Sequence, residues 1–195
     1  MSIGVTMLPT KNYMKAMLVG SLAFLGLSFC SPPAPAKTAH AHLLHNTNYE
    51  VECLALNIYW EARNQPVKGM LAVAMVTRNR VNDKRFPHTY CEVVYEGPTR
   101  PSWKDPTVYY PVKNRCQFSW YCDGKADAVP VIDEDLYFII KTMAYKIYYN
   151  RVKDITYGAT HYHADYVKPA WAKSKLKTIT IANHIFYRWE RNTPR

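Results

Sequence analysis

The stretch Gly69-Met-Leu-Ala-Val-Ala-Met-Val76 decides the fold, because it is apolar on every side of a helix. A helix that lacks a polar face is buried on all sides. Pro66 marks its beginning, and Arg78 and Arg80 follow in its last turn, where positive charge suits the helix dipole. The sequence therefore predicts a central helix against which the remaining elements pack.

Two further helices are expected around this segment. Thr47-x-x-Glu50 has the pattern of a capping box, and apolar residues then recur at helical spacing as far as Ala62. A later helix is predicted over about 134–149, with Asp133 as its cap. Its inward-facing residues are expected to be Leu136, Ile140, Met143, Ala144 and Ile147.

The rest of the chain suggests loops and late strands. Residues 89–94 predict a short helix capped by Thr89, and the four prolines within 96–115 predict a long loop. Ala159–Ala164 and Thr178–Ile185 are alternating or β-branched and predict strands. We expect an α+β domain with a buried helix pair and a small late sheet.

The N-terminal segment has the features of a secretory signal peptide. Lys11 and Lys15 precede a short apolar run, and small residues suited to cleavage follow at Ala34-x-Ala36. An uncleaved membrane anchor is the alternative, and it would be the only membrane contact. We therefore predict a signal peptide or anchor at 1–36, a linker at 37–46 and one catalytic domain at 47–192, exported to the periplasm, the cell envelope or the medium.

Four cysteines remain after removal of the signal peptide. An even number in an exported chain indicates disulfides, with three possible connectivities. Because Cys116 and Cys122 bracket a five-residue loop, we favour that pair together with Cys53–Cys91. The chain has no tight Cys-x-x-Cys pair of the kind that structural zinc sites use, so we predict no metal and no cofactor.

Composition narrows the function. The 195 residues contain neither a dinucleotide-binding nor a P-loop glycine motif, which disfavours a nucleotide-driven enzyme. Net charge falls only from +10 to +8 when Lys11 and Lys15 are removed with the signal, so the exported domain itself is basic. We therefore expect an anionic wall polymer, rather than nucleic acid, as the partner. We also expect the protein to be a monomer.

One carboxylate stands out as a candidate general acid. Glu61 falls in the last turn of its predicted helix, directly after Tyr59 and Trp60. Aromatic neighbours that exclude water and the negative end of a helix both disfavour the charged form of a carboxyl group. A carboxylic acid kept protonated in this way is suited to donate a proton. The alternative is a surface ion pair with Arg63 or Arg80.

The residues around Glu61 resemble the SleB-like cell wall hydrolases, and the resemblance runs in order over about residues 50–190. The stretches that carry it are Glu52-Cys-Leu-Ala-Leu-Asn-Ile-Tyr-Trp-Glu-Ala-Arg63, Gly69-x-x-Ala-Val-Ala-x-Val-x-x-Asn-Arg80-Val, Phe86-Pro87, Cys91-x-Val-Val-Tyr95, Cys116-Gln-Phe-Ser-Trp120, Cys122-Asp-Gly124, Gly158-Ala-Thr-His-Tyr-His163, Pro169-x-Trp171 and His184-x-Phe-Tyr187.

The resemblance implies a peptidoglycan hydrolase with a lysozyme-related or lytic-transglycosylase-related fold. The essential acid of the family, in its Tyr-x-Glu-Ala-Arg motif, falls on Glu61. Such enzymes cleave the bond between N-acetylmuramic acid and N-acetylglucosamine of peptidoglycan glycan strands. The proline-rich loop at 98–114 departs from many relatives.

A second carboxylate distinguishes two mechanisms. A standard glycosidase uses two, roughly 5–10 Å apart. Here Asp123 is the nearest candidate, with a turn-forming role as its alternative, and Asp165 is weaker. A lytic transglycosylase needs no second carboxylate, because the muramic 6-hydroxyl attacks C1. We favour that mechanism.

Further candidates are expected to contact the sugar. The resemblance implies this for His161 and His163, which alternate on a strand and share one face. The alternative for these two is a metal site with His184. Four other candidates of the same kind are Gln117, Ser119, Thr160 and Tyr162.

Two other function classes stay open on sequence alone. An amidase or peptidase acting on the stem peptide would need a zinc site or a Cys–His pair. A non-catalytic glycan-binding domain would have no reason to place Glu61 beside two aromatic residues. The masses of the products released from peptidoglycan distinguish these classes.

Overall fold

The computed structural model describes residues 37–190, with side chains from residue 46 onward. The predicted signal peptide or anchor at 1–36 lies outside the described residues. Within 37–190, no helix combines the length and hydropathy that crossing a membrane requires. The elements are α1 (Lys37–Ala62), α2 (Val67–Val81), α3 (Tyr90–Val94), β1 (Thr99–Pro101), β2 (Tyr109–Pro111), η1 (Ser119–Cys122), η2 (Val131–Asp133), α4 (Glu134–Tyr148), β3 (His161–Ala164), η3 (Ala170–Ser174), β4 (Leu176–Ile181) and β5 (His184–Arg188).

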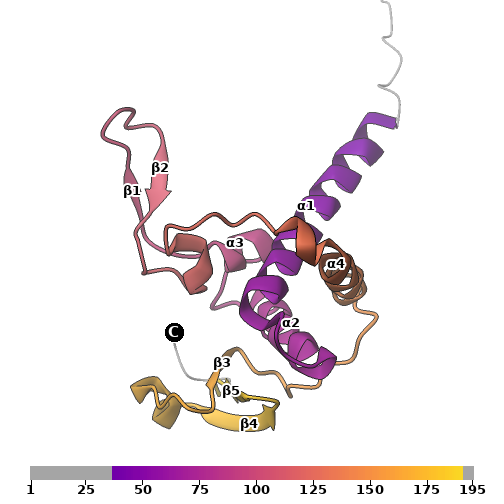
Figure 1. The fold of residues 1–195 in the computed structure, drawn as a ribbon, viewed down its shortest axis with the longest axis vertical. Coiled ribbons are helices and arrows are strands. Elements are labelled where there is room, and N and C mark those ends of the chain that lie inside the picture. The colour runs from indigo at the N-terminus through magenta and orange to yellow at the C-terminus, as the bar shows by residue number, and fades with distance from the viewer. Residues whose placement is uncertain (1–36, 191–195) are drawn as a thin grey trace, which may run out of the picture. The chain divides into compact units, whose positions relative to one another are not determined.

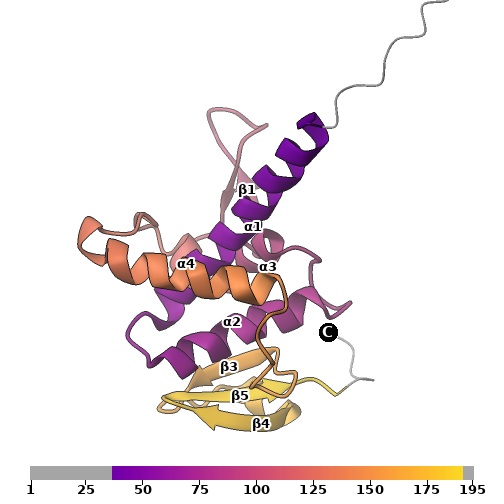
Figure 2. The same ribbon diagram turned by 90° about the vertical axis from the view of Figure 1, so that its right-hand side faces the viewer.

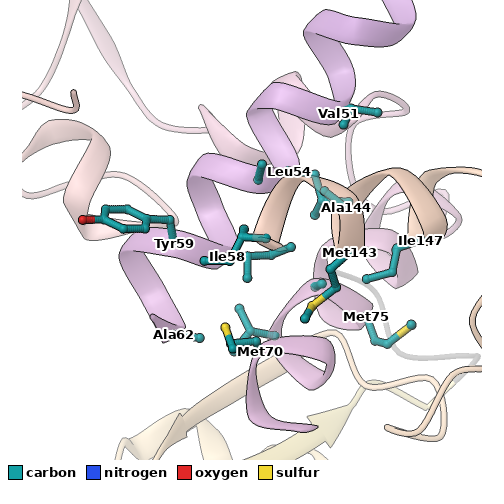
Figure 3. Packing of buried hydrophobic residues seen from close by; sticks show 14 of the residues in the cluster. Val51, Leu54, Ile58, Tyr59, Ala62, Met70, Met75, Met143, Ala144 and Ile147 are labelled. Atoms are coloured by element: carbon teal, nitrogen blue, oxygen red, sulfur yellow. The ribbon is translucent and has the colours of Figure 1, made fainter. Parts of the chain in front are cut away.

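Helices α1, α2 and α4 enclose the main hydrophobic core (Figure 3). Leu54 and Ile58 of α1, Met75 of α2 and Ile147 of α4 are fully buried in it. Truncating such a side chain to alanine costs about 2–5 kcal/mol, so the core dominates stability. The prediction of a central helix is confirmed, because residues 69–76 of α2 are buried with the single exception of Leu71.

Helix α1 begins ten residues earlier than the capping-box pattern predicts. It starts at Lys37, so the segment predicted to be a linker is helical and Thr47 lies inside the helix. Glu50 is buried, and its Oε2 accepts hydrogen bonds from the backbone nitrogens of Tyr90 (2.6 Å) and Cys91 (3.3 Å). The carboxylate therefore caps α3, whose first N–H groups have no partner within their own helix.

Two other helix predictions hold. Thr89 is the N-cap of α3, and its Oγ1 accepts a hydrogen bond from the backbone nitrogen of Glu92. Helix α4 follows Asp133, but the Asp133 carboxylate makes no capping bond; it accepts a hydrogen bond of 2.6 Å from the Tyr59 hydroxyl instead. Of the five predicted inward-facing residues of α4, Leu136 is only partly buried and the others are buried.

A three-stranded antiparallel sheet lies beside α2, in the strand order β3-β5-β4 (Figure 2). A small cluster joins the two layers through Ala72 and Val76 of α2 and Ile181 and Phe186 of the sheet. The predicted strand over 178–185 is in fact two strands, because the chain reverses at Ala182, which has a left-handed φ of 48°. The expected α+β fold is confirmed.

The predicted loop at 96–115 contains a two-stranded hairpin. Strand β1 pairs antiparallel with β2, with Arg100 opposite Tyr110. Proline is tolerated in such edge strands because its missing N–H can face solvent. Proline content alone therefore led to a wrong prediction of irregular structure.

Both favoured cysteine pairs are bonded in the structure. Cys53 of α1 is joined to Cys91 of α3 across 38 residues, and Cys116 is joined to Cys122 across six. The first bond connects two core helices. The second closes the loop that carries η1.

Candidate active site

Glu61 stands in the last turn of α1, as predicted, at the edge of an open hollow of about 390 Å³. The side chain is partly buried. We call this feature the Glu61 hollow. The residues that line it are Trp60, Glu61, Arg63, Ser119, Trp120, Asp123, Lys125, Ala126 and Asp127.

The partner of Glu61 comes from the sheet. The Tyr162 hydroxyl on β3 donates a hydrogen bond of 2.7 Å to Glu61 Oε2. Tyr162 also packs against Phe186 and His184 of β5, with ring centroids 5.7 Å and 5.2 Å away. Burial, together with the charge of Glu61, raises the pKa of Tyr162, so its hydroxyl stays protonated and remains a donor.

The environment of Glu61 favours its protonated form. Burial raises the pKa of Glu61, and the hydrogen bond from Tyr162 and the charge of Arg80 oppose that rise without cancelling it. Arg80 itself is held at the end of α2, where its Nε donates a hydrogen bond of 2.8 Å to the carbonyl oxygen of Thr160. A carboxyl group with a raised pKa is able to act as a general acid closer to neutral pH.

The aromatic neighbours of Glu61 have different roles. Tyr59 points into the helical core and bonds to Asp133, whereas Trp60 lines the hollow. The guanidinium carbon of Arg63 lies 4.9 Å from the ring centroids of both Tyr59 and Trp60. Arg63 is thus engaged with aromatic faces, which disfavours the predicted alternative of a surface ion pair between Arg63 and Glu61.

Two tryptophans form a wall of the hollow. Trp60 and Trp120 are stacked, with ring centroids 6.4 Å apart. Trp60 Nε1 donates a hydrogen bond to the carbonyl oxygen of Asp127, and Trp120 Nε1 donates one of 3.1 Å to Asn57 Oδ1. Because both indole nitrogens are bonded, the rings are held in place. Trp120 is buried, so it is the partly exposed Trp60 that offers apolar surface suited to a sugar ring.

Two aspartates lie in the same hollow as Glu61. Asp123, the nearest candidate for a second carboxylate, accepts a hydrogen bond of 2.8 Å from the backbone nitrogen of Lys125 and lies 3.5 Å from Lys125 Nζ. These contacts are those of a turn-forming residue, which is the alternative role that the sequence suggests for Asp123. Asp127 was not predicted; burial and the charge of Asp123 raise its pKa. Its only sequence signal is its place four residues after Asp123 in a short polar segment.

Of the other predicted sugar contacts, the structure places some at the Glu61 hollow and others away from it. Ser119 lines the hollow, and Gln117 is exposed on the adjoining disulfide loop. Thr160 is buried and does not line the hollow; its Oγ1 lies 2.9 Å from His161 Nδ1, and its carbonyl oxygen accepts the hydrogen bond from Arg80. Asp165 lies after β3 and does not line the hollow.

Two of the three candidate histidines lie on the face of the sheet opposite Tyr162. His161 and His163 share one face of β3, and both rings contact Trp171 at centroid distances of 5.5 Å and 5.6 Å. His184 is on the opposite face, beside Tyr162. The alternation of β3 and β5 therefore separates His184 from the other two, and a three-histidine metal site does not form. Neither His161 nor His163 lines the Glu61 hollow.

The bond from Tyr162 to Glu61 leads to a prediction about pH. We expect Tyr162→Phe to move the alkaline limb of the pH–rate profile to higher pH. The lost hydrogen bond favours the carboxylate, so its removal raises the pKa of Glu61 further and keeps the acid protonated longer. The maximal rate should fall about tenfold, the value of one hydrogen bond to a charged group.

Tyr187→Phe is the matched control for that experiment. The Tyr187 hydroxyl is 3.0 Å from His163 Nε2, on the face of the sheet that Tyr162 does not occupy. Its removal should leave the alkaline limb in place. A Tyr162→Phe limb that stays fixed or moves to lower pH would contradict the geometry.

Comparison with known proteins bears on the family and the fold of this chain. The sequence model of the Cell Wall Hydrolase family matches residues 64–187 and begins just after Glu61. The spore cortex-lytic enzyme of Bacillus subtilis is 33% identical over 63 residues, which are 32% of this chain and 21% of that protein. That of Oceanobacillus iheyensis is 40% identical over 47 residues, 24% of this chain and 17% of that protein. The matched segments are thus about a fifth of the length of these relatives.

Two solved structures share the fold. The catalytic domain of SleB from Bacillus cereus superposes with a TM-score of 0.52 at 24% identity, covering 71% of this chain and 89% of that domain. The catalytic domain of the germination-specific lytic transglycosylase SleB from Bacillus anthracis gives 0.51 at 24% identity, covering 71% and 93%. With the family model matched over most of its described residues, this chain belongs to the Cell Wall Hydrolase family.

Proposed function

We propose that this protein cleaves the glycosidic bond between N-acetylmuramic acid and N-acetylglucosamine in peptidoglycan, with Glu61 as the general acid. One observation carries the proposal: a partly buried carboxyl group of raised pKa, oriented by Tyr162, faces an open hollow with two fixed tryptophans. Family membership and the names of the spore cortex-lytic relatives support the choice of substrate.

The reaction begins with proton transfer. Protonated Glu61 donates its proton to the glycosidic oxygen as the bond to the muramic C1 breaks, so that N-acetylglucosamine leaves with a free 4-hydroxyl. Positive charge develops on C1 and on the ring oxygen. The resulting Glu61 carboxylate is then correctly charged to act as a base, and the Tyr162 hydroxyl stabilises that anion.

We infer that the nucleophile is the muramic 6-hydroxyl rather than water. Its oxygen bonds to C1, and its proton passes to the Glu61 carboxylate, which regenerates the acid and leaves a 1,6-anhydro product. This route needs no second carboxylate. The engagement of Asp123 with Lys125 supports it, as does the description of the Bacillus anthracis relative as a lytic transglycosylase.

Product mass tests the proposal directly. Digestion of purified peptidoglycan should release muropeptides that end in anhydromuramic acid, each lighter by one water than the product of hydrolysis. Reducing muramic ends would support hydrolysis, and free stem peptides would support an amidase or peptidase. Either of those results would overturn the transglycosylase assignment.

The two aspartates of the hollow offer a second test. We expect Asp123→Asn and Asp127→Asn each to lower the rate less than about tenfold, because neither carboxylate takes part in the bond changes. A hydrolytic base at either position would instead be worth about a hundredfold or more. Initial rates of peptidoglycan solubilisation measure the difference, and a hundredfold loss in either variant would favour hydrolysis.

Rival chemistry has little support among the described residues. Cys53, Cys91, Cys116 and Cys122 are all disulfide-bonded, so none of them offers a thiolate nucleophile. Within 37–190 no group of three histidine, cysteine or acidic side chains is arranged to hold a metal ion. We further propose that the protein is exported, since its proposed substrate is a wall polymer and disulfides persist in oxidising compartments. We also propose that it acts as a monomer.

A further inference from the structure

The hairpin formed by β1 and β2 is the most exposed feature of the described chain. We call residues 98–112 the finger. Figure 1 shows the finger extending away from the helical core, on the side opposite α4. None of its residues belongs to the hydrophobic clusters of the protein. Packing stability therefore does not explain its composition.

The finger is nevertheless ordered by its own hydrogen bonds. Beyond the paired strands, the Ser102 backbone nitrogen donates a hydrogen bond of 2.7 Å to the Val108 carbonyl oxygen. The Val108 backbone nitrogen donates another to the Asp105 carbonyl oxygen. Asp105 Oδ1 also accepts hydrogen bonds from the backbone nitrogen and the hydroxyl of Thr107. Prolines at 98, 101, 106 and 111 further restrict the unfolded chain. An element that is already ordered loses less entropy when it binds a partner.

The finger exposes aromatic rings next to cations. Trp103 is 87% exposed, Tyr109 61% and Tyr110 52%. A shallow hollow of about 370 Å³ lies among Arg100, Ser102, Trp103, Lys104 and Tyr110. Lys104 Nζ lies 5.1 Å from the centroid of the Trp103 ring. Large aromatic side chains exposed together, without any core to join, mark an interaction surface.

This chemistry fits a glycan whose attached stem peptides carry carboxylates. Aromatic faces offer apolar surface to pyranose rings, and the two cations are placed to pair with carboxylate groups along the polymer. A lipid surface fits less well, because the turn of the finger is polar at Ser102, Asp105 and Thr107.

The finger is also continuous with the wall of the Glu61 hollow. Its base is closed by a hydrogen bond from the Val112 nitrogen to the Pro98 carbonyl oxygen. The chain then enters the disulfide loop, and Ser119 and Trp120 of that loop line the Glu61 hollow. A polymer gripped by the finger is therefore held by the same segment that forms the candidate cleavage site.

We propose that the finger is a second binding site for peptidoglycan, which holds a stretch of glycan and its carboxylate-bearing stem peptides outside the Glu61 hollow. This inference rests on the proposed function for the identity of the polymer. It assigns to the finger the retention of the insoluble substrate, a role distinct from the chemistry at Glu61.

Binding of an inactive protein to the wall tests the inference. In a Glu61→Gln background, Trp103→Ala/Tyr110→Ala should bind purified insoluble peptidoglycan at least about tenfold more weakly in a sedimentation assay, as expected for central aromatic contacts. Arg100→Gln/Lys104→Gln should also weaken binding and reduce its dependence on salt. Phe138→Ala on α4, where the ring is 73% exposed, is the matched control and should bind as its parent does.

Three results would overturn the inference. They are unchanged binding by the finger variants, an equal loss in the Phe138→Ala control, and a loss of binding to phosphatidylglycerol vesicles instead of peptidoglycan. The proposed chemistry is judged separately by the masses of the products of the wild-type protein. If the finger variants bind the wall normally, the assignment of Glu61 as the general acid is unaffected. Conversely, anhydro products would not support a binding role for the finger.

Discussion

Glu61→Gln is expected to lower the rate of peptidoglycan solubilisation at least about a hundredfold, the usual contribution of general acid catalysis. Glutamine preserves the shape of the side chain and can still accept the hydrogen bond from Tyr162, but it has no proton to give. The loss should appear both in the turbidity of a peptidoglycan suspension and in the amount of muropeptide released.

The stability of this variant separates a chemical loss from a folding defect. Burial raises the pKa of Glu61 in the folded protein, so its contribution to stability is present at low pH and is lost as pH rises through that pKa. The neutral amide avoids this loss, and the melting temperature at neutral pH should therefore stay the same or rise.

Glu134→Gln, at an exposed position in the first turn of α4, is the matched control and should keep full activity. A Glu61→Gln protein that retains near-wild-type activity would remove Glu61 from the mechanism.

Of the two disulfides, Cys53–Cys91 should have the larger effect on stability. Replacing both cysteines with alanine is expected to lower the free energy of unfolding by about 4 kcal/mol, from the chain-entropy model for a loop of this length. The bond spans 38 residues, encloses α2 and ties α1 to α3. Urea unfolding of both proteins without reductant measures the difference.

The Cys116–Cys122 bond is the internal comparison. Its six-residue step gives about 2 kcal/mol in the same model, so the corresponding double alanine variant should be the more stable of the two. Its effect should fall on activity, because the loop carries Ser119 and Trp120. Equal stability losses in the two variants, or four free thiols in the exported protein, would contradict this assignment.

Local sequence was sufficient to predict where the helices lie, apart from the start of α1, and to place Glu61, the candidate acid, in a last turn. The apolar run at 69–76 can only be satisfied by burial, and Thr89 caps its own helix within three residues. Glu61 falls in the last turn of α1 by spacing alone. In each case the determining contacts lie within one or two helical turns, where residue type and periodicity act directly.

Sequence patterns failed where the partner of a residue is distant. The Thr47-x-x-Glu50 pattern predicts a helix start, yet Glu50 caps α3 across 40 residues. Likewise, 178–185 looked like one continuous strand, because a turn at Ala182 carries no glycine or proline to mark it.

The sequence by itself determined which residue is the candidate acid and that its helix lies against a buried partner. Only the tertiary structure decided what holds that acid: Tyr162, 101 residues away, donates to it, while His161 and His163 on the same strand face the other way. Alternation along β3 assigns the three side chains to opposite faces, but the packing of the sheet on α2 decides which face meets Glu61. That choice depends on burying Phe186 and Ile181 against the helix, a property of the assembled core rather than of any local segment.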